Sequence, residues 1–403
     1  MSSVSFLDKL LDGVEVKWKA LGTLADLVRG NGLQKKDFTE AGVPAIHYGQ
    51  IYTHYGLSTT ETKSFVSPEL AKQLRKVDKG DVVITNTSEN LEDVGKALVY
   101  LGERQAVTGG HATILKPGEC LLGKYFAYFT QTEEFAAEKR KYAKGAKVID
   151  VSATDMAKIS VPIPCPDNPK KSLEIQAEIV RILDSFTELT AELTAELTAR
   201  KKQYNYYRDK LLSFEDGEVE WKTLGDLAEN LDSMRRPITS GLREPGDIPY
   251  YGASGIVDYV KDYIFDCDLL LVSEDGANLL ARNTPIAFSI SGKSWVNNHA
   301  HVLKFETYAE RKYVEYYLNS IDLTPYISGA AQPKLNKKSL ESIRIPNPPP
   351  EDKKRIVDIL DKFDALTGSI SDGLPREIEL RQKQYEYYRD LLLSFPKLEA
   401  AEA

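Results

Sequence analysis

The chain has 403 residues and a formal net charge of −8 at pH 7, with 60 acidic against 52 basic side chains. This length can supply two globular domains with cores of their own, and 42% hydrophobic with 28% charged residues is typical of globular proteins. The acidic balance argues against a nucleic-acid binder that relies on non-specific phosphate contacts.

The sequence shows no pattern typical of an exported or membrane-spanning protein. There is neither a signal peptide nor an apolar run long enough to cross a membrane. The three cysteines, Cys120, Cys165 and Cys267, lack the spacing of a metal site and cannot all pair. Such cysteines suit a reducing compartment, so we expect a cytoplasmic protein without membrane contact.

The N-terminal piece, residues 1–13, contains a motif that recurs near the middle of the chain. Asp8-Lys9-Leu10-Leu11 repeats Asp209-Lys210-Leu211-Leu212, which lies at the end of a predicted helix. We therefore expect residues 1–13 to be helical and to complete the C-terminal helical arm. The alternative is a short helix with a chance match.

Two regions, residues 14–166 and 215–349, mix short β-like runs with helical segments, so each is expected to be an α+β domain with a mixed sheet. Strands are expected near 81–85, 111–115, 268–273, 285–290 and 299–305, and helices near 121–135 and 309–320. Both regions end in proline-rich stretches, Pro162 to Pro169 and Pro346 to Pro350. Because proline favours extended backbone and blocks helix interiors, these stretches are interpreted as hinges before the helices that follow.

The first helical arm is expected over residues 167–214. Its apolar residues recur with heptad spacing, which is typical of a coiled coil. The seam is formed by Ile175, Ile179, Ile182, Phe186, Leu189 and Leu193. A stutter then falls on two identical tetrads, which locally unwinds a left-handed coiled coil. These tetrads, interpreted as part of a spacer, are Thr190, Ala191, Glu192, Leu193, Thr194, Ala195, Glu196 and Leu197.

The second helical arm is expected over residues 350–395 and is followed by a short tail, residues 396–403. This arm contains one more tetrad than the first. Gly368, Gly373 and Pro375 lie in the added stretch. These residues favour a kink or an interruption of the second helix.

Most of the chain is an internal duplication. Residues 201–214 read KKQYNYYRDKLLSF and residues 382–395 read QKQYEYYRDLLLSF. Weaker matches join the two α+β regions, among them Tyr48-Gly49 with Tyr251-Gly252 and His111-Ala112 with His299-Ala300. The fold expected is α+β, with two mixed α/β domains separated by two long helices that pack as an antiparallel coiled coil with pseudo-two-fold symmetry.

A pseudo-two-fold chain suits a partner that is itself nearly two-fold, such as duplex DNA. A helix of about 40 residues spans roughly 60 Å. This length corresponds to at most about 18 base pairs at about 3.4 Å each. The arms would then act as a ruler between two heads that contact DNA.

Catalytic motifs in the chain are weak. Asn347-Pro348-Pro349-Pro350 lacks the aromatic residue that an adenine methyltransferase loop uses to stack on a flipped base, and a hinge explains it better. Gly292-Lys293-Ser294 lacks the upstream glycine of a phosphate loop, since Ala287 stands there. His299 and His301 would share one face of a strand, but the five histidines form no convincing metal-ligand set.

The chain resembles the specificity subunit of a type I restriction-modification system. The resemblance lies in its two variable domains, the Leu-Thr-Ala-Glu-Leu tetrads and the repeated KKQYNYYRDKLLSF-type ends of its arms. The arms are especially similar to those of the IC subgroup. The resemblance covers the whole chain. It implies that each variable domain is a target recognition domain that reads half of a split DNA sequence. It also implies helices that set the gap and dock two methyltransferase subunits, which two motor-nuclease subunits then join.

The same resemblance implies that the chain has no catalytic centre and holds no cofactor. Adenine methylation with S-adenosylmethionine, and cleavage driven by ATP and Mg²⁺, would belong to the partners. A selective reader of this kind is compatible with an acidic chain if a basic partner subunit completes its affinity for DNA.

Polar loops after predicted strands supply the candidate DNA-reading residues, because base edges in the major groove are read by amides, cationic side chains and carboxylates. In the first domain these are Tyr48, Gln50, Asn86, Thr87, Ser88, Thr108 and His111. In the second domain they are Tyr251, Ser254, Ser273, Glu274, Asp275, Asn278, Asn297, Asn298, His299, Gln332 and Lys334. The alternative for any one of them is turn chemistry, which uses the same residue types.

Three tyrosines in each arm cannot all face one stripe of a helix, so some must point outward. Packing between the arms explains part of the set, and a docking surface for a partner explains the rest, since tyrosine is enriched at interfaces. The candidates are Tyr204, Tyr206 and Tyr207 and their copies Tyr385, Tyr387 and Tyr388.

Three functions compete at this point. The first is a non-catalytic subunit that recognises a bipartite DNA target. The second is a self-contained DNA-modifying enzyme, which the missing motifs disfavour. The third is a coiled-coil scaffold with two protein-binding heads and no sequence-specific DNA binding. Sequence-selective DNA binding by the partner-loaded protein would distinguish the first from the third.

Overall fold

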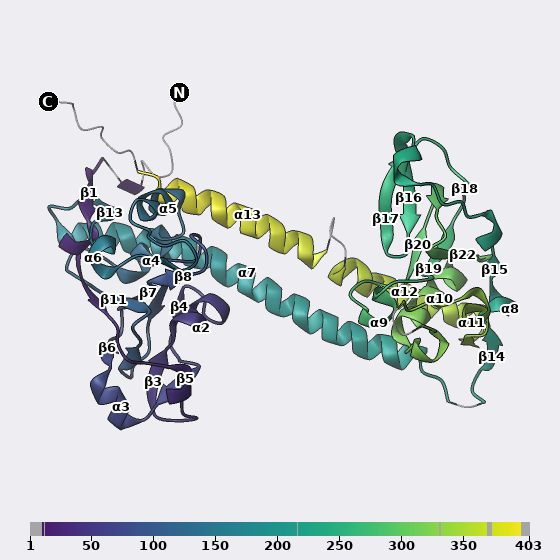
Figure 1. The fold of residues 1–403 in the computed structure, drawn as a ribbon, viewed down its shortest axis with the longest axis horizontal. Coiled ribbons are helices and arrows are strands. Elements are labelled where there is room, and N and C mark those ends of the chain that lie inside the picture. Colours follow the sequence, from purple (N-terminus) through teal and green to yellow (C-terminus); the bar gives the residue numbers. More distant parts are fainter. Residues whose placement is uncertain (1–9, 12, 216, 330–331, 369–372, 396–403) are drawn as a thin grey trace. The chain divides into compact units, whose positions relative to one another are not determined.

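The computed structural model describes residues 10–11, 13–215, 217–329, 332–368 and 373–395. The chain forms two compact units (Figure 1). Unit 1 comprises residues 1–192 with 379–403, and unit 2 comprises residues 193–378. Each unit therefore combines one of the expected α+β domains with pieces of both helical arms.

Unit 1 contains a five-stranded sheet in the order β2-β11-β7-β9-β4 and a four-stranded sheet in the order β5-β3-β10-β6. Two-stranded sheets, β1-β13 and β12-β8, complete it. The strands are β1 (Val16–Ala20), β2 (Ala25–Arg29), β3 (Val43–Ile46), β4 (Ser58–Thr59), β5 (Ser64–Val66), β6 (Arg75–Val77), β7 (Val82–Thr85), β8 (Thr87–Ser88), β9 (Ala97–Tyr100), β10 (Ala106–Thr108), β11 (Ala112–Pro117), β12 (Ile149–Asp150) and β13 (Ser160–Pro164).

Unit 2 contains two four-stranded sheets, in the orders β15-β22-β19-β20 and β17-β16-β21-β18, and the pair β14-β23. The strands are β14 (Glu220–Thr223), β15 (Glu229–Asn230), β16 (Pro245–Gly252), β17 (Gly255–Val260), β18 (Phe265–Asp266), β19 (Leu269–Ser273), β20 (Ala287–Ile290), β21 (Lys293–Val296), β22 (Ala300–Lys304) and β23 (Arg344–Asn347).

The helices lie between and after these strands. In unit 1 they are α2 (Tyr48–Thr53), α3 (Pro68–Gln73), α4 (Gly123–Phe129), α5 (Glu133–Arg140) and α6 (Ala153–Met156). In unit 2 they are α8 (Leu224–Leu227), α9 (Asn278–Ala281), α10 (Tyr308–Ser320), α11 (Lys337–Glu341) and α12 (Pro350–Thr367). The arm helices α7 (Pro169–Leu212) and α13 (Leu374–Leu393) each contribute residues to both units.

The sheets of the two units repeat one plan. The order β2-β11-β7-β9 corresponds to β15-β22-β19-β20, and β5-β3-β10-β6 corresponds to β17-β16-β21-β18. In the second of these two sheets a parallel pair joins the two central strands, β3 with β10 in unit 1 and β16 with β21 in unit 2. The expected duplication and the α+β fold with mixed sheets are confirmed.

Local sequence explains the central elements. The strands β7 and β19 consist of β-branched and aliphatic residues, except for Ser273 at the end of β19, and are buried along their whole length, as the interior of a covered sheet requires. The helix α10 begins after Thr307, whose hydroxyl accepts a hydrogen bond from the backbone N–H of Glu310. This cap and the acidic first turn stabilise the start of the helix.

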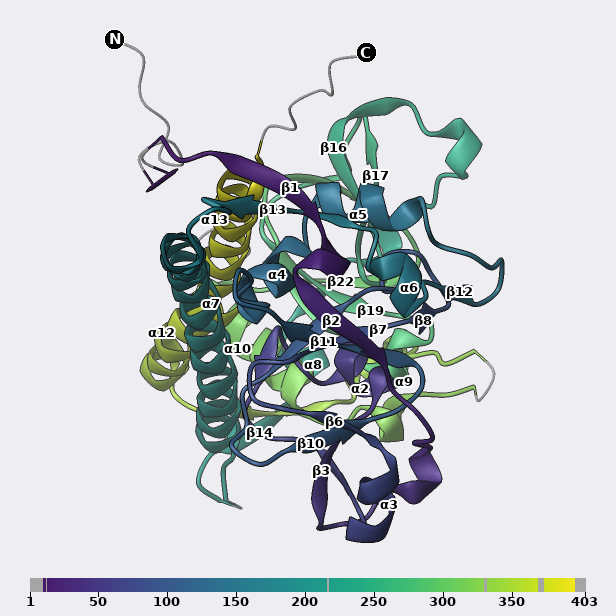
Figure 2. The ribbon, with the colours of Figure 1, turned by 90° about the vertical axis from the view of Figure 1, so that its left-hand side faces the viewer.

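The core of unit 1 is completed by both arms. The aromatic helix α4 packs on β9 and β11, and Figure 2 shows it beside α7. The same core contains Ile179 and Leu183 of α7 and Leu392 of α13. The Asp184 carboxylate of α7 accepts a hydrogen bond of 2.6 Å from the Tyr128 hydroxyl, which fixes α4 to the arm.

The core of unit 2 has the equivalent construction with the arms exchanged. It contains Ile356 and Leu360 of α12 and Leu212 of α7. The Asp361 carboxylate accepts a hydrogen bond of 2.6 Å from the Tyr316 hydroxyl of α10. Asp361 therefore repeats the role of Asp184 in unit 1.

Stacked aromatic rings join the arms inside each unit. In unit 1 the Phe186 ring of α7 lies 5.2 Å from the Tyr388 ring of α13. In unit 2 the Phe363 ring of α12 lies 5.8 Å from the Tyr207 ring of α7. The earlier part of α7 thus meets the later part of the second arm, and its later part meets the earlier part, as antiparallel helices require.

The second arm differs from the single helix expected over residues 350–395. It consists of α12 and α13, with Gly368 following the last helical residue of α12. The stretch rich in glycine and proline favours this interruption because neither residue supports a helix interior. Residues 369–372 lie outside the described part of the chain.

The ends of the chain are only partly described. Leu10 and Leu11 are helical and pack against the hydrophobic core of unit 1, which also contains Leu392 and Leu393. The rest of the expected N-terminal helix except Gly13, and the whole tail, residues 396–403, lie outside the described residues. No helix of the described part is both long enough and apolar enough to span a membrane.

Candidate functional site

In unit 1 the structure brings three predicted loops together at one end of the strands. The backbone N–H of Asn86 donates to the His111 carbonyl over 2.8 Å. The Thr87 hydroxyl lies 3.0 Å from His111 Nδ1, and the Tyr48 ring lies 4.8 Å from the His111 ring. The loops that contain residues 47–50, 86–90 and 108–111 therefore form one cluster.

In unit 2 four predicted loops meet in the same way. The Asp275 carboxylate lies 2.9 Å from His299 Nδ1, and the Lys334 ammonium lies 3.1 Å from the Glu274 carboxylate. The backbone N–H of Asn297 donates to the Tyr251 carbonyl over 3.0 Å. Four separate segments of sequence thus supply one polar surface.

The two loop clusters are equivalent in backbone structure. In the sheet register Ala112 pairs with Thr85, and Ala300 pairs with Ser273. The residues that follow those strands make matching backbone bonds, because Asn86 and Glu274 donate to the carbonyls of His111 and His299 over 2.8 and 2.9 Å. Equivalent pairs are Asn86 with Glu274, Thr87 with Asp275, and His111 with His299.

One equivalence expected from the sequence is wrong. Tyr251 pairs with Val296 in the parallel strands of unit 2, and the corresponding pair in unit 1 is Ile46 with Thr108. Tyr251 therefore occupies the place of Ile46, and Tyr48 belongs to the helix α2 that follows. The Tyr-Gly motifs match in sequence but not in position, because the connection after the strand differs. In unit 1 the helix α2 follows β3, whereas in unit 2 β16 continues into a hairpin with β17.

Burial divides the candidate reading residues. Side chains that reach base edges must be accessible, whereas buried polar side chains must be bonded within the protein. The exposed candidates are His111, Ser254, Asn298, His299, Gln332 and Lys334. The half-buried candidates are Tyr48, Gln50, Ser88, Tyr251, Asp275 and Asn278. The buried candidates are Asn86, Thr87, Thr108, Ser273, Glu274 and Asn297.

The buried candidates have partners that hold the loops. The Thr108 hydroxyl donates to the Ile46 carbonyl over 2.8 Å, and the Ser273 hydroxyl donates to the Ala253 carbonyl. The side-chain oxygen of Asn297 accepts from the backbone N–H of His299 over 2.8 Å. These side chains order the loops, and a direct contact of any candidate with DNA stays a prediction.

The interior beneath the cluster is neutral in unit 1. The side-chain oxygen of Asn86 accepts a hydrogen bond of 2.8 Å from the Thr113 hydroxyl, and both residues are fully buried. The Asn86 amide nitrogen has no partner in the described residues. An uncharged pair therefore supports the loop in this unit.

The interior beneath the cluster is ionic in unit 2. Arg235 lies 2.5 Å from Glu274 and 3.4 Å from Asp232. The buried His301 ring lies 2.6 Å from Asp232 through Nδ1 and 2.7 Å from the Leu335 carbonyl through Nε2. Both ring nitrogens therefore face acceptor oxygens.

The network lowers the pKa values of its two carboxyls. Burial alone would raise the pKa of Glu274, but its hydrogen bond from Arg235 and the charges around it hold that pKa below its usual value. Burial is likewise outweighed at Asp232 by the bond to His301. Sequence reasoning missed Asp232 and Arg235, and the proximity of an Asp and an Arg three residues apart was the only signal available.

Three residues of the same network are arranged in a way that could hold a metal ion. Asp232, Glu274 and His301 offer ligand atoms within 4.8 Å of one another. Arg235 already pairs with both carboxylates, so the cluster is better explained as an ion-pair network. The expectation that His299 and His301 share a strand face is wrong, because His299 lies in the turn before β22 and is exposed.

The other sequence motifs have structural roles. Asn347 ends the strand β23, and Pro350 begins α12, as a hinge requires. Lys293 and Ser294 lie in β21, after Gly292 in the bend that connects β20 of one sheet to β21 of the other, and no helix follows β21 as in a phosphate loop. The three cysteines are half-buried and free.

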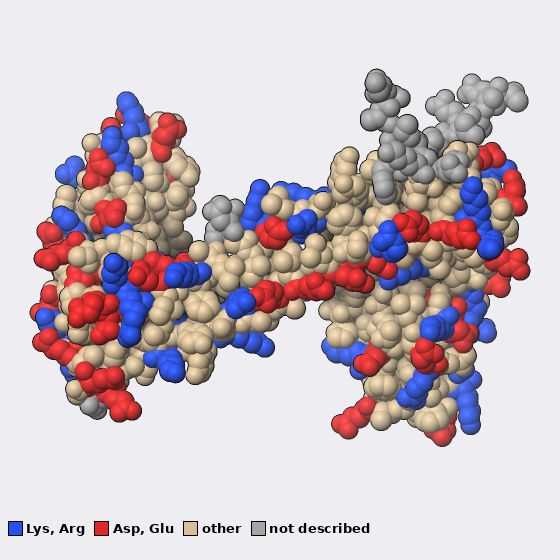
Figure 3. All heavy atoms as spheres, turned by 180° about the vertical axis from the view of Figure 1, so that it is seen from behind, with Lys and Arg blue, Asp and Glu red and all other residues tan. Residues whose placement is uncertain are grey.

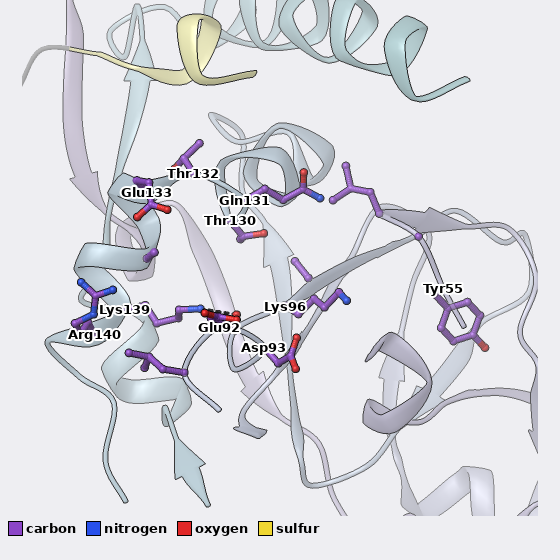
Figure 4. Close-up of a pocket in the computed structure, with 16 residues that line it drawn as sticks. Tyr55, Glu92, Asp93, Lys96, Thr130, Gln131, Thr132, Glu133, Lys139 and Arg140 are labelled. Carbon is purple, nitrogen blue, oxygen red and sulfur yellow. Dashed lines mark hydrogen bonds between the residues drawn. The ribbon is translucent and has the colours of Figure 1, made fainter. Parts of the chain in front are cut away.

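A cavity of about 650 Å³ lies elsewhere in unit 1, beside α5 (Figure 4). The buried Lys139 ammonium donates to the carbonyls of Glu92 and Val94 over 3.0 and 2.7 Å, and burial lowers the pKa of this lysine. Acidic and basic side chains both line the cavity. None of the candidate reading residues lines this cavity, so it is separate from the loop cluster.

The tyrosines of the arms separate into two groups. Tyr204 and Tyr385 pack against the cores, and Tyr207 and Tyr388 stack on phenylalanines. Tyr206 and Tyr387 are 61% and 64% exposed. The exposure of Tyr206 and Tyr387, at the same place in both copies of the motif, confirms the expectation that some tyrosines point outward. Tyr207 is also 38% exposed, although its ring stacks on Phe363.

The spacer tetrads lie in the uninterrupted helix α7. Only Leu193, Leu197 and Thr190 are half-buried, and the other tetrad residues are exposed. Glu188, Glu192 and Glu196 are exposed at intervals of one helical turn. Figure 3 shows acidic side chains in a row along the long helix.

The sequences of both units are similar to those of known proteins. Residues 13–200 and 217–380 match the family model of the type I restriction modification DNA specificity domain. The EcoR124I/EcoR124II specificity subunit of Escherichia coli is 38% identical over 424 residues, which cover 99% of each chain. The EcoprrI specificity subunit of the same species is 34% identical over 400 residues, which cover 92% of this chain and 93% of that protein.

Solved structures share the fold. The S subunit of a type I restriction-modification system from M. genitalium has a TM-score of 0.60 at 15% identity, covering 96% of this chain and 98% of that one. A chain from a study of complex assembly and conformational transition in the type I R-M system has a TM-score of 0.57 at 14% identity, covering 94% and 97%.

Proposed function

Because the chain belongs to the family of type I restriction-modification specificity subunits, we propose that each of its two target recognition domains reads one half of a bipartite DNA sequence. The observation that carries this proposal is the polar loop cluster that recurs at the same place in both units. The backbone of the clusters is equivalent while their side chains differ, as expected for two readers of different half-sites.

The arms are proposed to dock two methyltransferase subunits, which two motor-nuclease subunits then join. Tyr206 and Tyr387 support this proposal, because they present the same exposed aromatic ring twice. The acidic row on α7 disfavours contact between that face and DNA phosphates, and it suits a partner with basic side chains.

The chain is proposed to act without a catalytic centre of its own. Adenine methylation with S-adenosylmethionine, and restriction driven by ATP and Mg²⁺, would belong to the partner subunits. Since the DNA of a bacterial cell lies in its cytoplasm, the complex would act there. The competing function is a scaffold whose two heads bind proteins and have no sequence-specific affinity for DNA.

Genome-wide methylation mapping tests the main proposal. One host would express this chain with its cognate methyltransferase subunit, and a second host would express the methyltransferase alone. We expect a split motif of two short half-sites to be methylated only in the first host. No new methylation from a complex shown to be intact would favour the scaffold.

The arms are also proposed to set the spacer between the half-sites. Deleting Thr190–Leu193 removes about 6 Å of helix, equivalent to less than two base pairs. The two tetrads are identical, so deletion of either gives the same chain. We expect a shorter preferred spacer with both half-sites unchanged, measured by methylation mapping.

A length-preserving control is Glu192→Gln, an exposed position in the same tetrad. It should keep both the half-sites and the spacer. Changed half-sites with an unchanged spacer in the deletion variant would contradict the ruler.

A further inference from the structure

Two exposed histidines occupy the same place in the two units. His111 directly precedes β11, and His299 directly precedes β22. The strands that follow them pair in the same register with β7 and β19. The domains differ in most of their loop residues, so a histidine retained at this position in both clusters points to a shared task.

Each ring is tethered by a residue at the same distance along the chain. His111 Nδ1 lies 3.0 Å from the hydroxyl of Thr87, and His299 Nδ1 lies 2.9 Å from the carboxylate of Asp275, with a separation of 24 residues in both cases. An ionised carboxylate only accepts hydrogen bonds, so Nδ1 of His299 carries a proton. The Thr87 hydroxyl can donate or accept, which leaves the tautomer of His111 open.

The second ring nitrogen is left available in both. Within the described part of the chain, Nε2 of His111 and of His299 has no hydrogen-bond partner. The other histidines differ. His301 is fully buried with both nitrogens bonded, His47 is buried and accepts from the Gly49 N–H, and His54 is exposed without a tether.

We propose that His111 and His299 are equivalent DNA-contacting residues, one in each target recognition domain, whose Nδ1 tether fixes the ring so that Nε2 hydrogen-bonds to the duplex. This inference rests on the proposed function. A ring held in advance loses less conformational freedom on binding than a free side chain does. The bond made by one ring nitrogen also determines what the other can offer.

The chemistry of Nε2 allows two kinds of DNA group. A neutral His299 with its proton on Nδ1 offers an acceptor, which matches the amino groups of adenine or cytosine in the major groove. A protonated Nε2 offers a donor, which matches a phosphate oxygen or a purine acceptor. Both belong to the same duplex, and the experiment separates base from backbone contact.

The test uses the complex with its methyltransferase subunits and a duplex that carries the split motif found by methylation mapping. We expect His111→Ala to weaken binding about three- to tenfold, as loss of one hydrogen bond predicts, and His299→Ala to do the same. Duplexes with single base-pair changes in one half-site then locate each contact. His111→Ala should affect only the half read by unit 1, and His299→Ala only the other half.

Two further variants separate contact from folding. His54→Ala, an exposed histidine without a tether, should bind as the wild type does. Thr87→Val removes the tether through a buried residue of similar shape and should give a smaller loss than His111→Ala. Unfolding temperatures of all variants would establish that the fold is retained.

The outcomes are distinct. Relaxed preference at one base pair identifies a base contact, whereas a uniform loss with a salt slope reduced by about one identifies a phosphate contact. Wild-type affinity and preference in both histidine variants would overturn the inference and leave the proposed function standing. A wild-type complex with no sequence preference would instead overturn the proposed function.

Discussion

Beneath the loop cluster, unit 1 is neutral where unit 2 is ionic. Asn86 and Thr113 form an uncharged pair in the first, and Glu274 and His301 occupy the equivalent positions in the second. The ionic version adds Arg235, which lies 2.5 Å from Glu274. The backbone bonds around both are the same, so one loop geometry is supported by two kinds of chemistry.

The comparison shows which parts of a recognition domain are free to change. The main-chain ladder positions the loops, and the side chains below need only satisfy one another. An ion-pair network can replace a neutral pair if every charge has a partner, because an unpaired buried charge is costly. The two interiors should therefore respond differently to substitution and to pH.

The largest effect is expected from Arg235→Ala. It leaves Asp232 and Glu274 with less positive charge in a buried site and should destabilise unit 2 by about 3–5 kcal/mol. Urea unfolding can be followed by tryptophan fluorescence in a Trp18→Phe background, since the other tryptophans, Trp221 and Trp295, lie in unit 2.

Two other variants serve as references for Arg235→Ala. Arg236→Ala changes the neighbouring exposed arginine and should have little effect. Thr113→Val in unit 1 removes the neutral partner of Asn86 and should cost about 1–3 kcal/mol, measured by amide hydrogen exchange in β7 and β11. If Arg235→Ala cost no more than Thr113→Val, the ionic and neutral interiors would be energetically alike.

A smaller effect is expected from Glu274→Gln, together with a change in pH dependence. A carboxyl whose folded-state pKa is lowered contributes stability that is present above its ordinary pKa, 4.5 for glutamate, and lost as pH falls through the folded-state value. The variant should lose roughly 1.5–3 kcal/mol at pH 7. It should also show a flatter decline of unit 2 stability below about pH 4.5 than the wild type.

The measurement is urea unfolding of unit 2 from pH 3 to 7 in the same Trp18→Phe background. Wild-type and variant curves should converge at the acid end, where Glu274 is protonated in both folded and unfolded chains. A difference in unfolding free energy that is the same at every pH would mean that the charge of Glu274 does not contribute to stability.

The smallest effect on stability is expected where the two halves are alike. Tyr206→Ala and Tyr387→Ala remove exposed rings and should each change the free energy of unfolding by less than about 0.5 kcal/mol. If these rings dock the methyltransferase subunits, each variant should weaken one of two equivalent binding steps, measured by calorimetric titration. Tyr263→Ala, an exposed tyrosine outside the arms, is the control. Unchanged partner affinity in both arm variants would remove these tyrosines from the docking surface.

The sequence predicted the repeated parts of the fold well. Heptad spacing identified α7, and short β-like runs of residues identified β7, β19 and β22 within a few residues. The candidate reading loops were predicted at matching places because turn residues follow those strands, and the structure brings the loops of each unit together. The limits of the second arm were harder to predict, since glycine and proline favour an interruption without fixing its position.

The candidate residues were less predictable than the loops that carry them. Asn86, Thr108 and Glu274 have the composition of reading residues, but the structure buries them. Tyr48 and Tyr251 match in sequence, but the strand register separates them. Sequence gives the chemical type of a loop residue, whereas burial depends on segments far away in the chain.

The order of amino acids was enough to predict the duplication, the α+β class of the two domains, the heptad arms and the position of the loops. The duplication follows from repeated motifs, and the rest follows from the local spacing of apolar and turn-forming residues. The folded chain was needed to show which loop residues are accessible, that His111 and His299 are tethered alike, and that Asp232 and Arg235 complete a network with Glu274. Such contacts join residues from separate strands, and their energies depend on burial and charge that no local pattern encodes.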